Sequence, residues 1–309
     1  MKKKLICTIS ILVLAAALCS GCSTAPFKTT DSFASYYAKN KEEVGSDLKG
    51  MASDLAVLSD SEATDPNYQS NDYADLLIND STNEVLESYH CFDRLYPASI
   101  TKVMTALLTL EHGNMDDEIT LKHDINLTEN GAVISTLTKG DTVTVGQVFH
   151  TMLIKSANDC AVILAEYVAG SESKFIDMMN AKAKELGATH THFVNPNGLH
   201  DNNHYTTAYD LYLIFKEAVK YDTFVDTVSS KDYTMTYTTP KKTQINEYMQ
   251  STNYYLLNEF PVTTSMAKSC LILMTKNKKG ERFFSVVLGA ETKDMLYSSM
   301  SQLLEKTAN

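Results

Sequence analysis

A serine and a lysine stand three positions apart at the start of an apolar segment, at Ser99 and Lys102. A serine hydroxyl is a poor nucleophile by itself, but a lysine that burial has made neutral can take its proton. Residues i and i+3 share one face of a helix, so these two side chains can touch if the segment is helical. The pair alone is a weak signal, because a helix lysine most often faces water. The surrounding elements must decide whether the pair is catalytic or the lysine simply faces water.

The segment that carries the pair is predicted to be a helix. Apolar residues recur at helical spacing from Ile100 to Leu108, and Gly113 is a typical stop. Before it, residues 75–79 and 84–89 flank a polar turn, which predicts a β-hairpin. The pair would then follow the hairpin directly.

Further helices are predicted in the middle of the chain. Thr144-x-x-Gln147 is a capping box that opens one of them. Others are expected over 159–170, over 175–187 and from about Thr207. Two segments are compatible with either short strands or loop, namely 131–135 and 142–145.

The last third of the chain is strand-like. Residues 233–237, 270–274 and 282–288 read as strands, and the polar turn 276–280 predicts a hairpin between the last two. A closing helix is expected over 291–306. Helices in the middle with hairpins at both ends predict an α+β domain, its sheet covered by helices.

The bulk composition excludes some functions. The 309 residues are 44% hydrophobic, which is enough for a sizeable core. The formal charge is −11, and no block of lysine or arginine lies beyond the first four residues. These features argue against nucleic-acid binding.

The N-terminus is typical of an exported protein. Residues 1–22 combine a basic start with a short apolar stretch, as a signal peptide does. The end of this stretch resembles the lipobox of bacterial lipoproteins, with Cys22 as the lipidated residue, although Cys19 replaces the preferred leucine. Simple cleavage or an uncleaved anchor are the alternatives. We expect a tether over 23–72, a domain over 73–309, and a lipid anchor on the outer face of the cytoplasmic membrane.

The remaining cysteines and the clustered histidines do not indicate a metal site. Cys91, Cys160 and Cys270 are odd in number and widely spaced, so we expect buried free thiols. The histidines at 190, 192, 200 and 204 lie mostly on turns without the spacing of a ligand set. No metal and no cofactor are expected.

Several motifs in order carry a family resemblance. Ser99-x-x-Lys102 is followed by Ser156-x-Asn158, and family-like runs occupy 191–200, 204–208 and 286–290. From residue 75 to 304 the chain resembles the serine-type D-alanyl-D-alanine carboxypeptidases, low-molecular-weight penicillin-binding proteins of peptidase family S11. The resemblance implies a β-lactamase/transpeptidase-like fold, with an antiparallel sheet flanked by helices and a helical subdomain.

The resemblance also implies roles for four residues. Ser99 would attack the penultimate D-alanine carbonyl of a peptidoglycan stem peptide, with Lys102 as general base. Ser156 would relay a proton toward the leaving D-alanine, and Asn158 would bind the substrate backbone and the lysine. Water would hydrolyse the acyl-enzyme, and β-lactams would trap Ser99 as inhibitors.

One family element is missing from the sequence. These enzymes carry Lys-Thr-Gly or Lys-Ser-Gly on the strand beside the active site, where it binds the substrate carboxylate. No such triad occurs over 258–270, which suggests a short deletion between Val262 and Thr263. Lys268-Ser269 is the local substitute, although Cys270 then stands where glycine is wanted.

The missing triad leaves more than one function open. The first is a carboxypeptidase impaired in turnover, because losing an oxyanion donor and a carboxylate anchor slows the reaction. The second is a catalytically silent cell-wall-binding lipoprotein on the same fold. A β-lactamase is disfavoured, because no Glu-x-x-Leu-Asn run occurs in the appropriate region.

Overall fold

The computed structural model describes residues 55–56, 74–127, 129, 132–252 and 270–307, and the backbone alone over Thr263–Ala267. The predicted signal peptide, Cys22 and most of the predicted tether lie outside the described residues. Within that tether, Leu55 and Ala56 pack against the core of the domain, and Tyr209 Oη donates to the Ala56 carbonyl at 2.8 Å. No described helix has both the length and the apolar character needed to cross a bilayer.

The described chain alternates between strands and helices. The strands are β1 (Ala74–Asn79), β2 (Glu84–Tyr89), β3 (Glu118–Thr120), β4 (Thr142–Thr144), β5 (Asp232–Thr238), β6 (Gln244–Gln250), β7 (Thr263–Ala267), β8 (Cys270–Lys276) and β9 (Arg282–Leu288). The helices are the 3-10 helix η1 (Ala98–Thr101), α3 (Lys102–His112), α4 (Val145–Ile154), α5 (Asn158–Ala169), α6 (Glu172–Glu185), α7 (Ala208–Ala218), α8 (Asp222–Val228) and α10 (Lys293–Glu305).

The main sheet is antiparallel and joins the two ends of the domain. Its strand order is β2-β1-β9-β8-β7, so the first and last hairpins meet where β1 pairs with β9. Both predicted hairpins are confirmed, as β1 with β2 and as β8 with β9. β7 pairs with β8 without a register shift.

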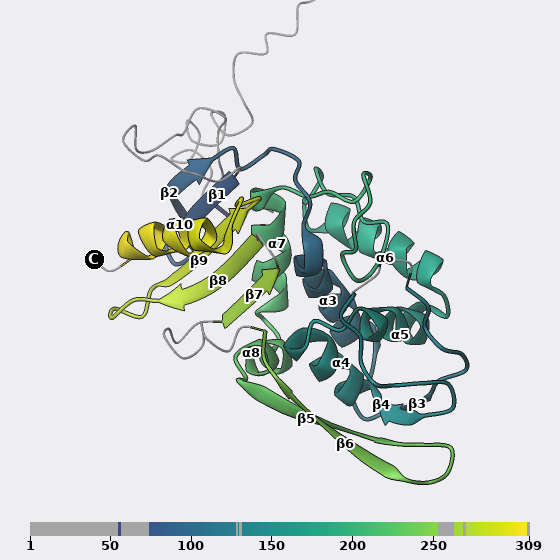
Figure 1. Ribbon diagram of the computed structural model, residues 1–309. Helices are drawn as coiled ribbons and strands as arrows, with labels where there is room; N and C mark the ends of the chain where they lie inside the picture. Colours follow the sequence, from purple (N-terminus) through teal and green to yellow (C-terminus); the bar gives the residue numbers. More distant parts are fainter. Residues whose placement is uncertain are drawn as a thin grey trace, which may run out of the picture. The chain divides into compact units, whose positions relative to one another are not determined.

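A second, smaller antiparallel sheet has the order β3-β4-β5-β6. The β5–β6 hairpin lies beside α8 and α4 (Figure 1) and pairs from Asp232–Gln250 to Thr238–Gln244. The sequence predicted neither β3 nor β6, because β3 is only three residues long and β6 alternates with glutamine, asparagine and glutamate. It also missed α8, a helix of only seven residues.

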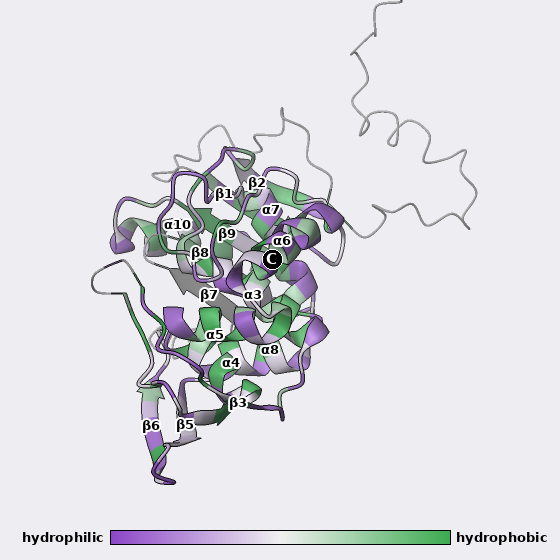
Figure 2. Cartoon of the chain, turned by 90° about the vertical axis from the view of Figure 1, so that its right-hand side faces the viewer, coloured by the Kyte–Doolittle hydropathy of each residue, from purple (hydrophilic) through white to green (hydrophobic). Residues whose placement is uncertain are grey.

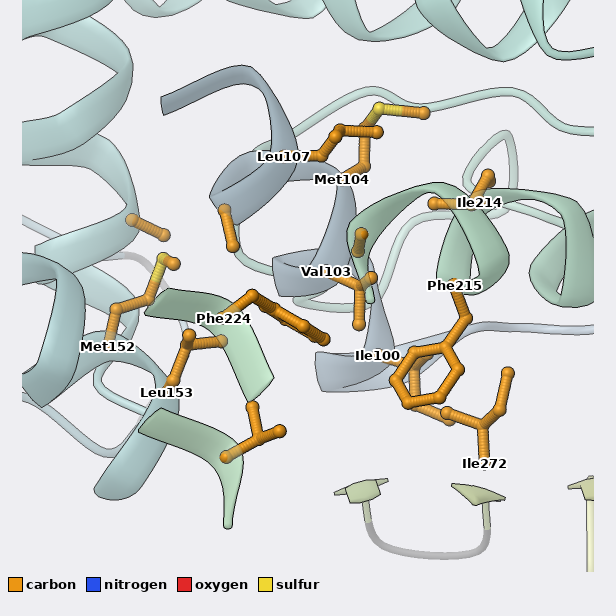
Figure 3. Close-up of a cluster of buried hydrophobic side chains, with 14 of the residues drawn as sticks. Ile100, Val103, Met104, Leu107, Met152, Leu153, Ile214, Phe215, Phe224 and Ile272 are labelled. Atoms are coloured by element: carbon orange, nitrogen blue, oxygen red, sulfur yellow. The ribbon is translucent and has the colours of Figure 1, made fainter. Parts of the chain in front are cut away.

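Helix α3 runs through the middle of the domain, between the main sheet and helices α4 and α5 (Figure 1). Every residue from Lys102 to Thr109 is buried. Apolar side chains of η1 and α3 gather with those of α7, α8 and β8 (Figure 3), and α4 and α5 carry hydrophobic residues along their length (Figure 2). Each fully buried large apolar side chain contributes about 1.5–3 kcal/mol. A lysine in this helix is therefore surrounded by protein.

Strand β9 is buried on both faces because helices cover both sides of the main sheet. Phe284, Val286 and Leu288 face the cluster around α3, whereas Phe283 and Val287 face α10. This double burial explains why the strand reads as a nearly continuous apolar run. The predicted α+β class is confirmed.

Several predicted helix ends are also confirmed. The hydroxyl of Thr144 accepts from the Gln147 backbone N–H, which is one half of the predicted capping box, and Thr207 caps α7 in the same way. The Gln147 side chain accepts from the Thr236 backbone N–H instead of completing the box. Gly170 ends α5 with φ of 76°, a left-handed conformation that favours glycine. Of the two undecided segments, residues 132–135 form loop and 142–144 form β4.

Candidate active site

Ser99 lies in η1, the first turn of the helical run that leads into α3. The preceding Ala98 has φ of 47°, in the left-handed region. A Cβ placed on Gly198 would lie 1.9 Å from the Ala98 carbonyl oxygen, so only glycine fits against this position. The Gly198 backbone thus packs on the strained residue that precedes Ser99. The positive end of the helical run favours negative charge that develops at Ser99.

Lys102 contacts Ser99 as the spacing predicts. The lysine is 2% exposed, and its Nζ donates to Ser99 Oγ at 3.1 Å. Nζ also donates to Asn158 Oδ1 at 2.9 Å and to the Asn197 carbonyl at 2.7 Å. Three partners therefore surround one ammonium group.

The protonation of Lys102 is set by its burial. Burial lowers the pKa of the ammonium to about 7, while Cys160 and Asp159 act in the opposite direction. Asn158 Oδ1 and the Asn197 carbonyl can only accept, so they retain two N–H groups of the neutral amine. The lone pair then occupies the third position, which faces Ser99. In this geometry the lone pair of neutral Lys102 can accept the serine hydroxyl proton, so the arrangement is suited to a general base.

Asn158 is oriented by the loop opposite α3. Its Nδ2 donates to the Val133 carbonyl at 2.9 Å, and its backbone N–H donates to the same oxygen at 2.8 Å. These bonds assign the amide oxygen to the Lys102 side. The predicted contact between Asn158 and the lysine is present.

The loop that contains Val133 is itself fixed by a buried carboxylate. Asp159, 4% exposed, accepts from Ser135 Oγ at 2.5 Å and from the Ser135 backbone N–H at 2.9 Å. A carboxylate that accepts several hydrogen bonds is a strong anchor. Residue 159 therefore holds one wall of the site.

A second link joins this loop to the β5–β6 hairpin. Thr136 Oγ1 donates to Glu247, and Lys155 Nζ donates to Glu247 Oε1 at 2.7 Å. Thr136 also contacts the Tyr237 hydroxyl at 3.2 Å. The small sheet thus supports the wall from outside.

Ser156 lies on the turn between α4 and α5, with φ of 60°. Its side chain is partly exposed, and within the described part of the chain its hydroxyl makes no hydrogen bond. The structure therefore places Ser156 two residues before Asn158 without joining its hydroxyl to the Lys102 network. Its role as a proton relay stays a prediction.

The 195–199 loop supplies contacts that sequence reasoning did not assign. Thr105 Oγ1 donates to the Pro196 carbonyl at 2.6 Å, which joins the loop to α3. Asn195 closes the turn, accepting from the Gly198 N–H at 2.7 Å and donating to the Leu199 carbonyl at 2.9 Å. The turn could be predicted from the sequence. Which backbone carbonyl binds the lysine could not, because every residue type has a backbone carbonyl.

A cleft of about 780 Å³ opens over Ser99. Val133 and Asn158 line one side, and Tyr96 and His200 line the other. The Tyr96 and His200 rings meet edge to face, with centroids 4.6 Å apart. Tyr96 is 50% exposed and Val133 is 45% exposed, so the rim offers apolar surface to a ligand.

The strand side of the cleft is described only in part. Cys270, at the start of β8, lines the cleft, and its Sγ donates to the Tyr96 carbonyl at 3.6 Å. The predicted deletion before Thr263 and the predicted substitute Lys268-Ser269 lie outside the described residues. Both stay predictions.

The three described cysteines are free and buried, as predicted. Burial raises the pKa of the Cys270 thiol to about 11, so this thiol is not a reactive thiolate at neutral pH. Within the described ranges, no group of three histidine, cysteine or acidic residues is arranged to hold a metal ion.

Comparisons with known proteins agree with this arrangement. The profile of the D-alanyl-D-alanine carboxypeptidase family matches residues 60–292. The carboxypeptidase DacF of Bacillus subtilis is 33% identical over 236 residues, covering 74% of this chain and 60% of the relative. The carboxypeptidase DacC of Escherichia coli is 31% identical over 238 residues, covering 74% and 59%. The chain thus spans about three fifths of the length of these relatives.

Solved structures share the fold. A Streptomyces DD-transpeptidase superposes with a TM-score of 0.70 at 25% identity, over 77% of this chain and 97% of that protein. Penicillin-binding protein D2 of Listeria monocytogenes, in a cefotaxime-bound form, gives a TM-score of 0.65 at 26% identity, over 78% and 98%. With the family profile matching most of the chain, and with Ser99 and Lys102 in contact beneath a cleft, the chain belongs to the D-alanyl-D-alanine carboxypeptidase family.

Proposed function

We propose that this protein is a serine-type D-alanyl-D-alanine carboxypeptidase that removes the terminal D-alanine of peptidoglycan stem peptides. The observation that carries the proposal is the contact between Ser99 Oγ and the buried Lys102 Nζ, whose pKa is lowered to about 7. A serine beside a base that is partly neutral at physiological pH is an activated nucleophile. The relatives named carboxypeptidases support the choice of substrate.

Acylation begins when neutral Lys102 takes the hydroxyl proton of Ser99. Oγ bonds to the penultimate carbonyl carbon, and the carbonyl oxygen becomes an oxyanion. The backbone N–H of Ser99 belongs to the first helical turn, whose N–H groups lack intrahelical partners, and it can donate to this oxyanion. The proton then passes to the leaving nitrogen, by way of Ser156 in our proposal. The C–N bond breaks, and free D-alanine leaves an ester on Ser99.

Deacylation repeats the sequence with water. Lys102 takes a proton from a water molecule, and the water oxygen attacks the ester carbonyl carbon. The C–O bond to Ser99 breaks as its oxygen takes the proton back. The products are the shortened peptide and free enzyme. A β-lactam carbonyl would enter by the same attack, and its ring-opened ester would remain on Ser99.

Labelling with a fluorescent penicillin tests the nucleophile. We expect a covalent adduct on the wild-type protein and none on Ser99→Ala, with D-alanine release from a stem pentapeptide lost in the same variant. Ser156→Ala should form the adduct more slowly, because it lacks the relay. An adduct that persists in Ser99→Ala would exclude Ser99 as the nucleophile.

A catalytically silent cell-wall-binding protein is the second candidate. The observation that favours it is the absence of Lys-Thr-Gly from residues 258–270. This candidate predicts that the protein binds purified peptidoglycan, forms no penicillin adduct and releases no D-alanine. Release of D-alanine that depends on Ser99 would exclude it.

The proposed location is the outer face of the cytoplasmic membrane, with a lipid on Cys22. The support comes from the sequence, where a basic and apolar leader ends at a lipobox-like run. Cys22→Ala should move the protein from the membrane fraction to the soluble fraction. Cys7→Ala, outside the lipobox-like run, is the matched control and should leave it in the membrane fraction.

A further inference from the structure

His204 is a buried side chain that joins the 191–205 loop to the nucleophile's helix. It is 2% exposed, and it lies at the cleft. Its Nδ1 accepts from the Val194 backbone N–H at 3.1 Å, which places the ring hydrogen on Nε2. Nε2 therefore donates to Thr101 Oγ1, 2.7 Å away. The imidazole uses both nitrogens in one tautomer.

Thr101 stands between Ser99 and Lys102 in the chain. It is the last residue of η1, where the 3-10 turn becomes α3, and it is 1% exposed. Its hydroxyl caps neither helix, so the bond to His204 is not a local capping interaction. The bond fixes the helical turn from a residue that lies 103 positions away in sequence.

The turn that His204 fixes contains strained backbone. Ala98 has a positive φ, and the carbonyl of this residue contacts Gly198 of the same loop. A strained residue keeps its conformation only when its surroundings determine it in several ways. The Thr101–His204 bond is one such determinant, and the Lys102 contact with the Asn197 carbonyl is another.

We propose that His204 is a positioning residue for the Ser99–Lys102 pair and that it acts through Thr101. The proposal rests on the proposed function, since it assigns His204 to the acylation step. The imidazole does not touch the reacting atoms. It sets the rotation of η1 and therefore the direction in which Ser99 Oγ meets Lys102 Nζ.

The charge state of His204 suits this task. Burial lowers the pKa of the imidazole to about 4, with Asp201 acting in the opposite direction and His192 and His200 adding to the decrease. At neutral pH the ring therefore keeps one hydrogen. A second hydrogen on Nδ1 would face the Val194 N–H, which is itself a donor, and the bond would be lost.

Two pairs of variants separate the bonds of His204. Thr101→Val removes the hydroxyl at nearly constant volume, and Thr101→Ser restores it. In His204→Gln the amide reaches the position of Nε2, whereas in His204→Asn it reaches only that of Nδ1. We expect Thr101→Val and His204→Asn to slow penicillin acylation roughly tenfold, and Thr101→Ser and His204→Gln to lose less than threefold. His192→Gln, on the same loop, is the control and should acylate at the wild-type rate.

The kinetic constants distinguish positioning from general destabilisation. Positioning predicts that the first-order acylation step slows at 15 °C, well below the unfolding transition, while the Kd for penicillin stays within twofold. Wild-type acylation in Thr101→Val, or equal losses in His204→Gln and His204→Asn, would overturn the proposal.

A readout independent of activity keeps this test separate from the proposed function. Amide hydrogen exchange over residues 99–104 should quicken at least tenfold in Thr101→Val and His204→Asn, with residues 232–250 unchanged. If the wild-type protein forms no penicillin adduct, the proposed function fails, and the exchange rates alone decide whether His204 fixes this turn. Unchanged exchange over 99–104 would refute that role.

Discussion

The two sides of the cleft differ in how completely they carry the family's machinery. On the helical side, Ser99, Lys102 and Asn158 form one hydrogen-bonded group, and Lys102 and Asn158 are fixed by further contacts. On the strand side, the chain lacks the Lys-Thr-Gly triad over 258–270, and Cys270 at the start of β8 lines the cleft. The proposed nucleophile and base are therefore in contact, whereas the sequence motif expected to anchor the substrate is missing.

From this difference we expect acylation to depend less on the strand side of the cleft than substrate positioning does. The Ser99–Lys102 contact joins η1 to α3, and the 195–199 loop accepts a second hydrogen bond from Lys102. A change at the β7 side can thus lower substrate affinity and turnover while the activated serine remains. A penicillin, which carries its own strained carbonyl, should depend less on the anchor than a stem peptide does.

The largest expected effect is the loss of the base. Lys102→Met should slow penicillin acylation about a thousandfold, because general base catalysis contributes 10²–10⁴. In the wild type the neutral amine is the active form, so the acylation rate should rise with pH through about 7 and level off above it. Stopped-flow acylation from pH 5 to 9 measures both. Lys182 of α6 pairs with Glu111 of α3, near the end of that helix opposite to Lys102. Lys182→Met should therefore keep the wild-type rate and pH profile. A rise through pH 7 that persists in Lys102→Met would contradict the assignment.

The next effect concerns the strand side. Inserting Lys-Thr-Gly between Val262 and Thr263 should raise kcat/KM for a stem pentapeptide about a hundredfold, since one oxyanion donor alone is worth 10²–10³. In a second variant the same triad replaces residues 261–263. The insertion restores the family spacing if the triad was deleted, and the replacement keeps it if the triad was substituted, so the more active variant shows which change occurred. Penicillin acylation should rise much less than peptide turnover. Equal gains for both substrates would show that the two sides are not separable.

The helical side of the site could be predicted from the sequence more completely than the strand side. The spacing of Ser99 and Lys102 and the pattern of apolar residues after them predict that a helix brings the two together, and they do touch. The capping pattern at Thr144 begins α4 and Gly170 ends α5, and the small polar residues between these helices indicate the turn that precedes Asn158. Local rules suffice for these features because the interactions lie within a few residues of each other.

Long-range backbone contacts could not be predicted in this way. Asn197 binds Lys102 through a carbonyl that every residue type has, and His204 reaches Thr101 across 103 positions. The histidine lay in a recognised run, but its type alone fits a turn, a ligand or a buried donor equally well. The three-residue strand β3 and the polar strand β6 were missed because tertiary pairing, rather than propensity, holds them.

A smaller effect is expected at Asp159, which fixes the loop beside the cleft and acts on the pKa of Lys102. Asp159→Asn removes a negative charge that raises the pKa of Lys102, so the midpoint of the acylation profile should move to lower pH. Ser135→Ala keeps that charge and loses one hydrogen bond, which should cost about 1–3 kcal/mol of unfolding free energy. Its midpoint should match the wild type. Identical midpoints in both variants would show that Asp159 acts only as an anchor for the loop.

The smallest effect is expected at the Lys155–Glu247 pair, which links the end of α4 beside the cleft to the β5–β6 hairpin. Lys155 and Glu247 pair at 2.7 Å, with side chains 29% and 14% exposed, so solvent and salt screen the attraction. Lys155→Met should therefore lower the unfolding free energy by less than about 1 kcal/mol and slow acylation less than threefold. Thr136 still donates to Glu247 in this variant and keeps the loop joined to the hairpin. Chemical denaturation at low and high salt measures the difference, with Lys220→Met at the more exposed Glu217 pair as control. A tenfold loss of acylation in Lys155→Met would mean that the wall depends on the small sheet as strongly as Ser99 depends on α3.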